Sequence, residues 1–328
     1  MTSHMKAAVC RQYGPPDVVT IENWPTPVPG RGDVLIRVRA CTVSSADWRI
    51  RSCSMPTGFG VLGRLAFGIT APRPPVLGSE LAGDIVVIGD AVHNFAVGDA
   101  VVAFSGTKLG AHAEYCCRRA HGVIVRKPAT LSYETAAALA FGGTTALDFF
   151  RRAALRPSDR VLINGASGAV GSAMVQLAVA AGAEVTAVCS GANAEAMQQL
   201  GAAHAIDYTR VDFARDGQRY DLIADTVGNA PYSRVRDALS SHGRLLLVLA
   251  TLPEMLRAPW VTATSRHRLV AGPTAERVDD LQTLVDMAVA GRLAPLIDSR
   301  FTFDAIAAAH ARVESRRKRG SVVITVSP

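Results

Sequence analysis

One segment, residues 161–182, limits the possible folds of this 328-residue chain more than any other part of it. It reads VLINGASGAVGSAMVQLAVAAG, an apolar run that four glycines and several polar side chains interrupt. A helix that spans a bilayer needs about 20 unbroken apolar residues, so we do not expect a membrane span here. The segment instead predicts a strand over 161–164, a turn over 165–168 and a helix beginning near Ala169.

The turn has the glycine spacing of a dinucleotide-binding fold. Gly168 would let the backbone approach a pyrophosphate, Gly171 would let the helix pack closely, and the helix N-terminus offers N–H groups to the anion. Ala stands at the first glycine position of the usual fingerprint, so the alternative is a purely structural turn. The strand-turn-helix context favours cofactor binding by Ala166, Ser167, Gly168, Ala169 and Val170.

The next expected strand, 185–189, bears on the choice of cofactor. NAD-binding sites usually place an acid after this strand to bind the ribose 2′-hydroxyl. This chain has Ser190 there and Asn193 shortly after it. An uncharged serine leaves room for a 2′-phosphate, so we predict NADPH with both residues in its site. No Lys or Arg follows at once, and the countercharge must come from elsewhere in the fold.

The pattern of expected secondary structure changes near residue 130. Short strands separated by Pro and Gly fill 6–127, whereas apolar strands alternate with Ala-rich helical segments from about Ser132 onward. The second pattern predicts βαβ units and a parallel sheet, hence an α/β fold. The final segments can return to the first unit, so we expect one domain from 1–127 and 266–328 and a second from 128–265.

Composition excludes several classes of function. The chain is 49% hydrophobic and 19% charged, as in a globular protein, and its N-terminus does not resemble a signal peptide. Its six cysteines form no C-x-x-C pair, so we expect reduced thiols in the cytoplasm. The net charge is +7, but the sequence has no cluster of basic residues interleaved with aromatic residues, as a nucleic-acid-binding surface would. We expect no nucleic-acid partner, no membrane, and a solvated helix end at 316–319.

Several longer motifs, in order along the chain, carry a resemblance to a known family. They are PVLGSELAGDIVVIGDAVHNFAVGDAVVAF (75–104), GAHAEY (110–115), LSYETAAALAFGGTTAL (131–147), GASGAVG (165–171), LGAAHAIDY (200–208) and the closing GRLAPLIDSRFTFDAIAAAHARVESRRKRGSVVITV. The chain thereby resembles the medium-chain dehydrogenase/reductases, in particular their zinc-independent quinone oxidoreductase-like branch. The resemblance implies a GroES-like β-barrel domain from both chain ends, a Rossmann domain between them, and a cofactor in the cleft.

The resemblance also bears on metal binding. In zinc-dependent relatives, three ligands stand where this chain has Ser44, Ser79 and Gly142, and only Glu80 remains of that group. Zinc is held by thiolate, imidazole or carboxylate, so we predict no metal. A zinc-dependent alcohol dehydrogenase remains the alternative enzyme.

Without a Lewis acid, hydride donation to an already electrophilic acceptor is easier than alcohol oxidation. We therefore expect an NADPH-dependent reductase of a small hydrophobic quinone or α,β-unsaturated carbonyl. The resemblance suggests Ser44, Asp47 and Thr145 as catalytic candidates, with Thr145 beside the nicotinamide and Tyr208 near the adenosine phosphate. The alternatives are a turn-forming serine, a loop-organising aspartate and ordinary packing at the other two positions. A nucleotide-binding protein of low activity is the competing function.

Two further segments carry expectations. The insert at 51–74 is long and apolar, and we expect it to cover the substrate side. The segment 266–271 should form the last strand of the parallel sheet, with unpaired backbone groups on its outer edge. Relatives commonly meet at such an edge around a two-fold axis, so we predict a homodimer.

Overall fold

The computed structural model describes residues 3–106 and 108–326, which form two compact units. Unit 1 comprises the chain up to Met55, Gly60–Thr144 and the chain from Glu276 onward. Unit 2 comprises Pro56–Phe59 and Thr145–Ala275. One boundary falls inside helix α3 (Tyr133–Ala153), so no linker separates the units there. The main boundaries between the units fall at 144/145 and 275/276. The boundaries expected from the sequence, 127/128 and 265/266, both lie earlier in the chain.

Unit 2 is built on a six-stranded sheet in the order β10-β9-β8-β11-β12-β13, in which every neighbouring pair is parallel. The strands are β8 (Arg160–Asn164), β9 (Glu184–Cys189), β10 (His204–Asp207), β11 (Tyr220–Asp225), β12 (Leu239–Leu247) and β13 (Arg268–Ala271). The predicted parallel α/β sheet is confirmed. The strand order reverses at β8, and ligands of such sheets bind at the carboxyl ends of the strands beside this switch point.

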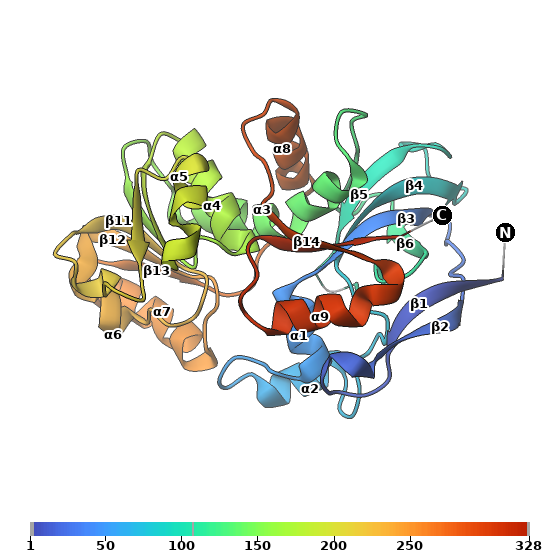
Figure 1. The fold of residues 1–328 in the computed structure, drawn as a ribbon, viewed down its shortest axis with the longest axis horizontal. Helices are drawn as coiled ribbons and strands as arrows, with labels where there is room; N and C mark the ends of the chain where they lie inside the picture. The colour runs from blue at the N-terminus through green and yellow to red at the C-terminus, as the bar shows by residue number, and fades with distance from the viewer. Residues whose placement is uncertain (1–2, 107, 327–328) are drawn as a thin grey trace. The chain divides into compact units, whose positions relative to one another are not determined.

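Helices cover both faces of this sheet. They are α4 (Ala169–Ala180), α5 (Ala194–Gln199), α6 (Tyr232–Val235) and α7 (Leu252–Thr264). Figure 1 shows α4 and α5 on one side of the strands and α6 and α7 on the other. The centre of β8, Val161–Ile163, is therefore fully buried, which explains its uninterrupted apolar sequence.

Unit 1 contains a seven-stranded sheet, in the order β14-β15-β3-β4-β5-β7 with β6 also paired to β3, and a separate β1-β2 hairpin. The strands are β1 (His4–Cys10), β2 (Val19–Pro25), β3 (Asp33–Val43), β4 (Glu80–Ile88), β5 (Ala100–Phe104), β6 (Tyr115–Arg119), β7 (Ile124–Arg126), β14 (Ile297–Thr302) and β15 (Ser321–Thr325). Val322 is the register partner of Val43, so both ends of the chain share one sheet.

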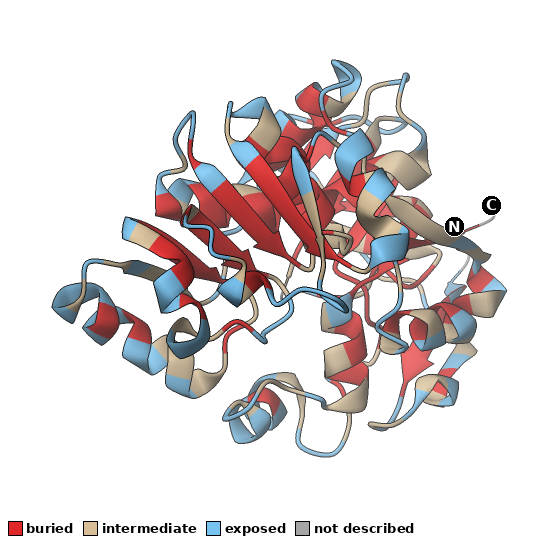
Figure 2. Cartoon of the chain, turned by 60° about the vertical axis from the view of Figure 1, so that its left-hand side comes forward, coloured by how far each residue is buried: buried red, intermediate tan, exposed pale blue. Residues whose placement is uncertain are grey.

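The helices of unit 1, besides the first part of α3, are α1 (Ser45–Ser52), α2 (Gly60–Phe67), α8 (Val278–Val289) and α9 (Ile306–Glu314). Buried residues follow the central strands of the sheets, whereas the outer helices are exposed along one side (Figure 2). In the described ranges, none of the helices has both the length and the apolar character needed to cross a bilayer.

Candidate cofactor and acceptor site

The glycine-rich turn of unit 2 joins the end of β8 to the start of α4. Gly165 has a φ of 81°, a conformation that favours glycine, and its carbonyl accepts a hydrogen bond of 3.0 Å from the Gly168 N–H. A Cβ at Gly171 would lie 2.2 Å from the Gly165 carbonyl oxygen, so only glycine lets the helix approach the turn this closely. The predicted packing role of Gly171 follows from this contact.

The first turn of α4 offers an anion site to a cofactor. Gly168 is the N-cap and provides no side-chain acceptor, so the first N–H groups of the helix have no capping partner from that residue. Ala166 is buried, whereas Ser167, Gly168, Ala169 and Val170 are partly exposed. This arrangement fits the pyrophosphate of a dinucleotide, and the structure places all five predicted turn residues together.

A buried carboxylate holds the neighbouring loop after β11. Asp225 accepts hydrogen bonds from the Asn164 side chain at 2.9 Å and from the backbone N–H groups of Val227, Gly228 and Ala230. Asp225 is 1% exposed, so these four donors satisfy a carboxylate that would otherwise be costly to bury. Sequence reasoning missed this network, although an acid at the end of an apolar strand was its visible signal.

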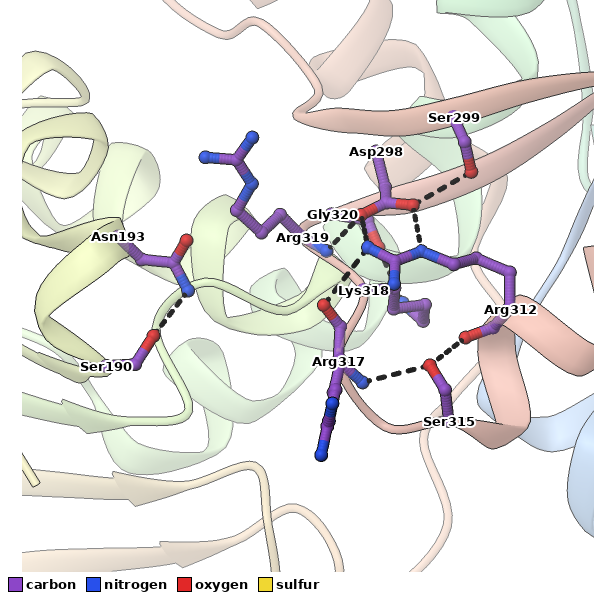
Figure 3. A network of polar contacts seen from close by, with 10 residues as sticks. All are labelled: Ser190, Asn193, Asp298, Ser299, Arg312, Ser315, Arg317, Lys318, Arg319 and Gly320. Carbon is purple, nitrogen blue, oxygen red and sulfur yellow. Dashed lines mark hydrogen bonds and ion pairs between the residues drawn. The ribbon is translucent and has the colours of Figure 1, made fainter. Parts of the chain in front are cut away.

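The end of β9 lies against the turn. The N–H groups of Gly165 and Ala166 both donate to the Val188 carbonyl at 3.1 Å. Beyond it, the Asn193 amide donates to the Ser190 hydroxyl at 3.1 Å (Figure 3). The structure therefore brings the predicted Ser190 and Asn193 together at the same strand end as the glycine-rich turn.

The adjacent strand β10 contributes residues to this end of the sheet. The Tyr208 N–H donates to the Cys189 carbonyl at 3.1 Å, and the Tyr208 side chain is 58% exposed. The preceding residue, Asp207, accepts hydrogen bonds from the hydroxyl and N–H of Thr209. The sequence predicts no acid directly after β9, but Asp207 reaches this strand end from β10, where it is the register partner of Cys189.

Thr145 is 8% exposed and begins the part of α3 that belongs to unit 2. Its predicted place beside a nicotinamide stays a prediction.

In unit 1, the catalytic candidates Ser44 and Asp47 form the N-terminal cap of α1. The Asp47 N–H donates to the Ser44 hydroxyl at 3.2 Å, and the Ser44 N–H and hydroxyl donate to Asp47 Oδ2 at 2.8 and 2.6 Å. Asp47 Oδ1 accepts the Gly78 N–H at 2.9 Å. These contacts give Asp47 the loop-organising role and engage the Ser44 hydroxyl as both donor and acceptor.

Glu80 connects three segments that are distant in sequence. Its carboxylate accepts hydrogen bonds from the Thr42 hydroxyl, at the end of β3, and from the Phe141 N–H, in α3, at 2.5 Å. Glu80 is 2% exposed, and burial raises its pKa to about 7 although both donors favour the ionised form. The carboxylate therefore gathers the segments that carry Ser44, Ser79 and Gly142 within unit 1.

Ser79 directly precedes Glu80 and is 2% exposed. Among the described residues, its hydroxyl has no hydrogen-bond partner. Its backbone carbonyl accepts the Ser105 N–H at 2.8 Å.

The residues gathered around Glu80 do not fit a catalytic zinc ion. The three places hold two hydroxyls and a glycine, and no thiolate or imidazole stands among them. Across 3–106 and 108–326, no three His, Cys, Asp or Glu side chains gather as candidate metal ligands.

The basic segment after α9 is anchored within unit 1. Asp298, on β14, accepts hydrogen bonds from the Arg312 side chain at 2.6 and 2.8 Å and from the Arg319 N–H at 2.7 Å (Figure 3). Burial opposes ionisation of Asp298, but these donors lower its pKa to about 2. Arg316, Arg317 and Arg319 are exposed, as expected for this run, whereas Lys318 is half-buried and its ammonium group donates to the Gly320 carbonyl.

The insert at 51–74 forms the end of α1 and the short helix α2. Val61 and Leu65 on α2 are 73% and 69% exposed. Its expected position over the substrate stays a prediction.

Comparisons with known proteins agree with this arrangement. Residues 30–144 match the family described as an alcohol dehydrogenase GroES-like domain, and residues 200–324 match the family described as zinc-binding dehydrogenase. The chain is 30% identical to the chloroplastic quinone-oxidoreductase QR1 of Triphysaria versicolor, over 92% of each chain. It is 29% identical to the 2-methylene-furan-3-one reductase of Solanum lycopersicum, over 99% of this chain and 80% of that protein.

A solved structure shows the same fold over the whole length. The quinone oxidoreductase from Coxiella burnetii aligns with a TM-score of 0.87 and 28% identity, over 99% of this chain and 100% of that one. The predicted GroES-like and Rossmann architecture is confirmed. The chain belongs to the medium-chain dehydrogenase/reductase superfamily as a quinone oxidoreductase-like oxidoreductase, a family whose chemistry uses a nicotinamide cofactor.

Proposed function

We propose that this protein is an NADPH-dependent reductase that transfers hydride to a quinone or an α,β-unsaturated carbonyl compound without a metal ion. The observation that carries the proposal is the set of residues around Glu80. In unit 1, the Glu80 carboxylate holds together the segments around Thr42 and Phe141. The residues at the three expected ligand positions, Ser44, Ser79 and Gly142, supply no zinc ligands. Unit 2 keeps the glycine-rich turn and the open first turn of α4.

This division of residues favours an acceptor that is already electrophilic. Bound NADPH supplies the hydride. A conjugated acceptor takes the hydride at carbon, moves an electron pair onto its carbonyl oxygen, and then takes a proton from solvent. No Lewis acid is needed to polarise an alcohol C–O bond, and the protein contributes orientation and hydrogen bonding.

The choice of NADPH is supported by the uncharged strand end at Ser190 and Asn193, which leaves room for a 2′-phosphate. We place the reaction in the cytoplasm as part of the proposal. All six cysteines are free thiols, as expected in a reducing compartment.

The test is an acceptor panel of quinones, alkenals and enones, with NADPH oxidation followed by absorbance. We expect turnover with at least one acceptor class, no loss after dialysis against a chelator, and less than stoichiometric zinc by elemental analysis. Stoichiometric zinc whose removal abolishes turnover would assign the zinc-dependent alternative. Saturable NADPH binding with no oxidation across the panel would assign a nucleotide-binding protein without this activity.

A further inference from the structure

We propose that the hydroxyl of Ser79 donates the hydrogen bond that the acceptor's carbonyl oxygen receives during hydride transfer. This inference rests on the proposed reductase function and deepens it. It assigns the contact with the acceptor oxygen to Ser79 and not to Ser44, which the resemblance suggested as a catalytic candidate.

The first step is that Ser44 is already occupied. Its hydroxyl donates to Asp47 Oδ2 at 2.6 Å and accepts the Asp47 N–H at 3.2 Å. A serine hydroxyl has one proton to donate, and Ser44 uses it on a carboxylate inside its own helix cap. A substrate oxygen could receive it only at the expense of the cap that begins α1.

The second step is that the hydroxyl of Ser79, unlike that of Ser44, has no hydrogen-bond partner among the described residues. Ser79 is 2% exposed. A buried hydroxyl without a partner is destabilising, and such groups in folded proteins are usually satisfied by a ligand or by an ordered water. A ligand oxygen that accepts from Ser79 would therefore gain a hydrogen bond without breaking one within the protein.

The third step is that the backbone of Ser79 is fixed on both sides. Before it, the Gly78 N–H donates to Asp47 at 2.9 Å, and after it, the backbone of Glu80 pairs with Phe104 in the β4–β5 ladder. The Ser79 carbonyl itself accepts the Ser105 N–H. A donor on a backbone held at three consecutive residues loses little freedom when it meets a ligand, which is the condition for preorganised stabilisation of charge.

Gly78 adds a constraint on the space beside this donor. Its φ is 91°, and a Cβ there would lie 2.5 Å from the ring of the buried His112. His112 Nε2 is bonded to the Thr42 carbonyl at 2.9 Å, and because a carbonyl only accepts, the proton of the neutral imidazole is used there. His112 Nδ1 has no partner among the described residues, but in this tautomer it has no proton to donate. Thr42 also uses its hydroxyl, on Glu80. Among these hydroxyls, Ser79 is the one whose proton the described structure leaves unused.

The reaction requires a hydrogen-bond donor at one atom of the acceptor, its carbonyl oxygen. Hydride from the cofactor forms a C–H bond at the β-carbon of an enone. The C=C π pair then forms the double bond between the α-carbon and the carbonyl carbon, and the C=O π pair moves onto oxygen, which becomes the negatively charged enolate oxygen. Ser79 shares its proton with that oxygen without transferring it. A solvent proton then adds at the α-carbon, so the saturated ketone and the oxidised cofactor are the products. For a quinone, the carbon that took the hydride then loses a proton to solvent as the ring becomes aromatic, and solvent protonates both oxygens, which gives the hydroquinone.

The experiment compares Ser79→Ala with Ser321→Ala, a second buried serine of unit 1, which lies on β15. In Ser79→Ala we expect kcat/KM for an enone to fall about 10- to 100-fold, mainly through kcat, because the bond strengthens as charge develops. Ser321→Ala should stay within about threefold of the wild type. NADPH binding, measured by fluorescence titration, should be unchanged in both variants.

Two further measurements separate this role from a structural one. The loss in Ser79→Ala should be larger for a simple enone than for a p-benzoquinone, because the enolate oxygen is the more basic acceptor. Ser79→Cys keeps nearly the same shape with a weak donor and should show the same pattern, which covers the case in which the alanine variant folds poorly.

The outcomes are distinct. An active wild type with Ser79→Ala at the wild-type rate, whatever its melting temperature, would overturn the Ser79 assignment and leave the reductase proposal standing. A selective loss in Ser44→Ala instead would return the contact to Ser44. A wild type that binds NADPH but reduces no acceptor would overturn the proposed function itself, and the Ser79 assignment with it.

Discussion

The backbone N–H of Gly191 donates a hydrogen bond to the carboxylate of Asp207, across the ends of two neighbouring strands. Asp207 and Cys189 are register partners in the β9–β10 pair, which brings the acid to the loop after β9. A Cβ at Gly191 would lie 2.6 Å from Asp207 Oδ2, so glycine is needed for this approach. Hydrogen bonds from Thr209 and Gly191 lower the pKa of Asp207, which is therefore an anion at neutral pH.

This carboxylate lies beside the loop that we propose for the 2′-phosphate of NADPH. Replacing it by Asp207→Asn should raise the ratio of kcat/KM for NADPH to that for NADH by roughly 3- to 10-fold, because one repulsive charge at a partly exposed position is removed. Steady-state kinetics with both cofactors measure this ratio. Asp212→Asn, which removes another exposed carboxylate of unit 2, is the control and should leave it unchanged. An unaltered ratio in Asp207→Asn would limit Asp207 to holding the loop.

Adding a charge at the same strand end should have the opposite effect. We expect Ser190→Asp to lower the preference for NADPH over NADH by at least about tenfold, because the new carboxylate repels a 2′-phosphate and can accept from a free 2′-hydroxyl. The same kinetic ratio tests it, with thermal unfolding to verify that the fold is kept. A wild-type enzyme that already prefers NADH would contradict the assignment of Ser190 to phosphate recognition.

The buried carboxyl of Glu80 should make stability depend on pH. Its pKa in the folded protein is raised from 4.5 to about 7, so the folded state holds this proton to higher pH than the unfolded chain does. The stability contribution of Glu80 is thus full below about pH 4.5 and is lost as the pH rises through 7, by about 3 kcal/mol in total. Asp47 and Lys318 act on this carboxyl with opposite signs.

Urea unfolding of the wild type and of Glu80→Gln at pH 5, 6, 7 and 8 tests this. The free energy of unfolding of the wild type minus that of the variant should decrease from pH 5 to pH 7 and level off by pH 8, because glutamine does not titrate. Glu195→Gln, at an exposed position, controls for the loss of one carboxylate and should give a nearly constant difference. A constant difference for Glu80→Gln would mean that Glu80 titrates alike in the folded and unfolded chains.

The edge strand β13 bears on assembly. It is the last strand of the sheet, as the sequence predicted. Two of its backbone groups, the Leu269 N–H and the Ala271 carbonyl, are already bonded to the side chains of Thr262 and Arg152. These groups are two residues apart and so face the same side. Pairing of β13 with a second copy would replace both side-chain contacts by ladder hydrogen bonds.

We predict a homodimer formed through this edge, and Leu269→Pro should weaken it because proline removes the outward donor. Val270→Pro, one residue along, alters a donor that faces the other way, toward β12, and should destabilise the subunit instead. Light scattering over a concentration series measures the mass, and urea unfolding measures the stability. A monomeric wild type at tens of micromolar would show that Thr262 and Arg152 protect the edge against pairing.

The sequence predicted best where one local pattern determines one element. The turn at 165–168 and the strand at 161–164 were predicted because glycine spacing and apolar runs are local signals, and β8 and α4 confirm them. The strand at 204–207 was missed, since its HAID sequence is short and only partly apolar. Its position at the sheet edge, which brings Asp207 to Gly191, depends on pairing with β9.

The acceptor side was less predictable, because its contacts join distant segments. Ser44 and Asp47 have the spacing of a capping box, and this local signal could have predicted their mutual bonds. The role of Glu80 could not be predicted in this way, since its two partners lie 38 and 61 residues away. The unpartnered state of Ser79 is a property of the packed unit and has no signature in the sequence.

The place of β15 in the sheet of unit 1 determines when that unit can be completed during synthesis. β15 lies between β14 and β3, and its residues Val322–Thr325 pair with Ala40–Val43. All six strands of unit 2 precede β14 and β15 in the chain, so its sheet can close while the ribosome is still adding the last strands of unit 1. The half of β3 that pairs with β15 therefore keeps an open edge until β15 has been made, and exposed strand edges of this kind are where newly made chains aggregate.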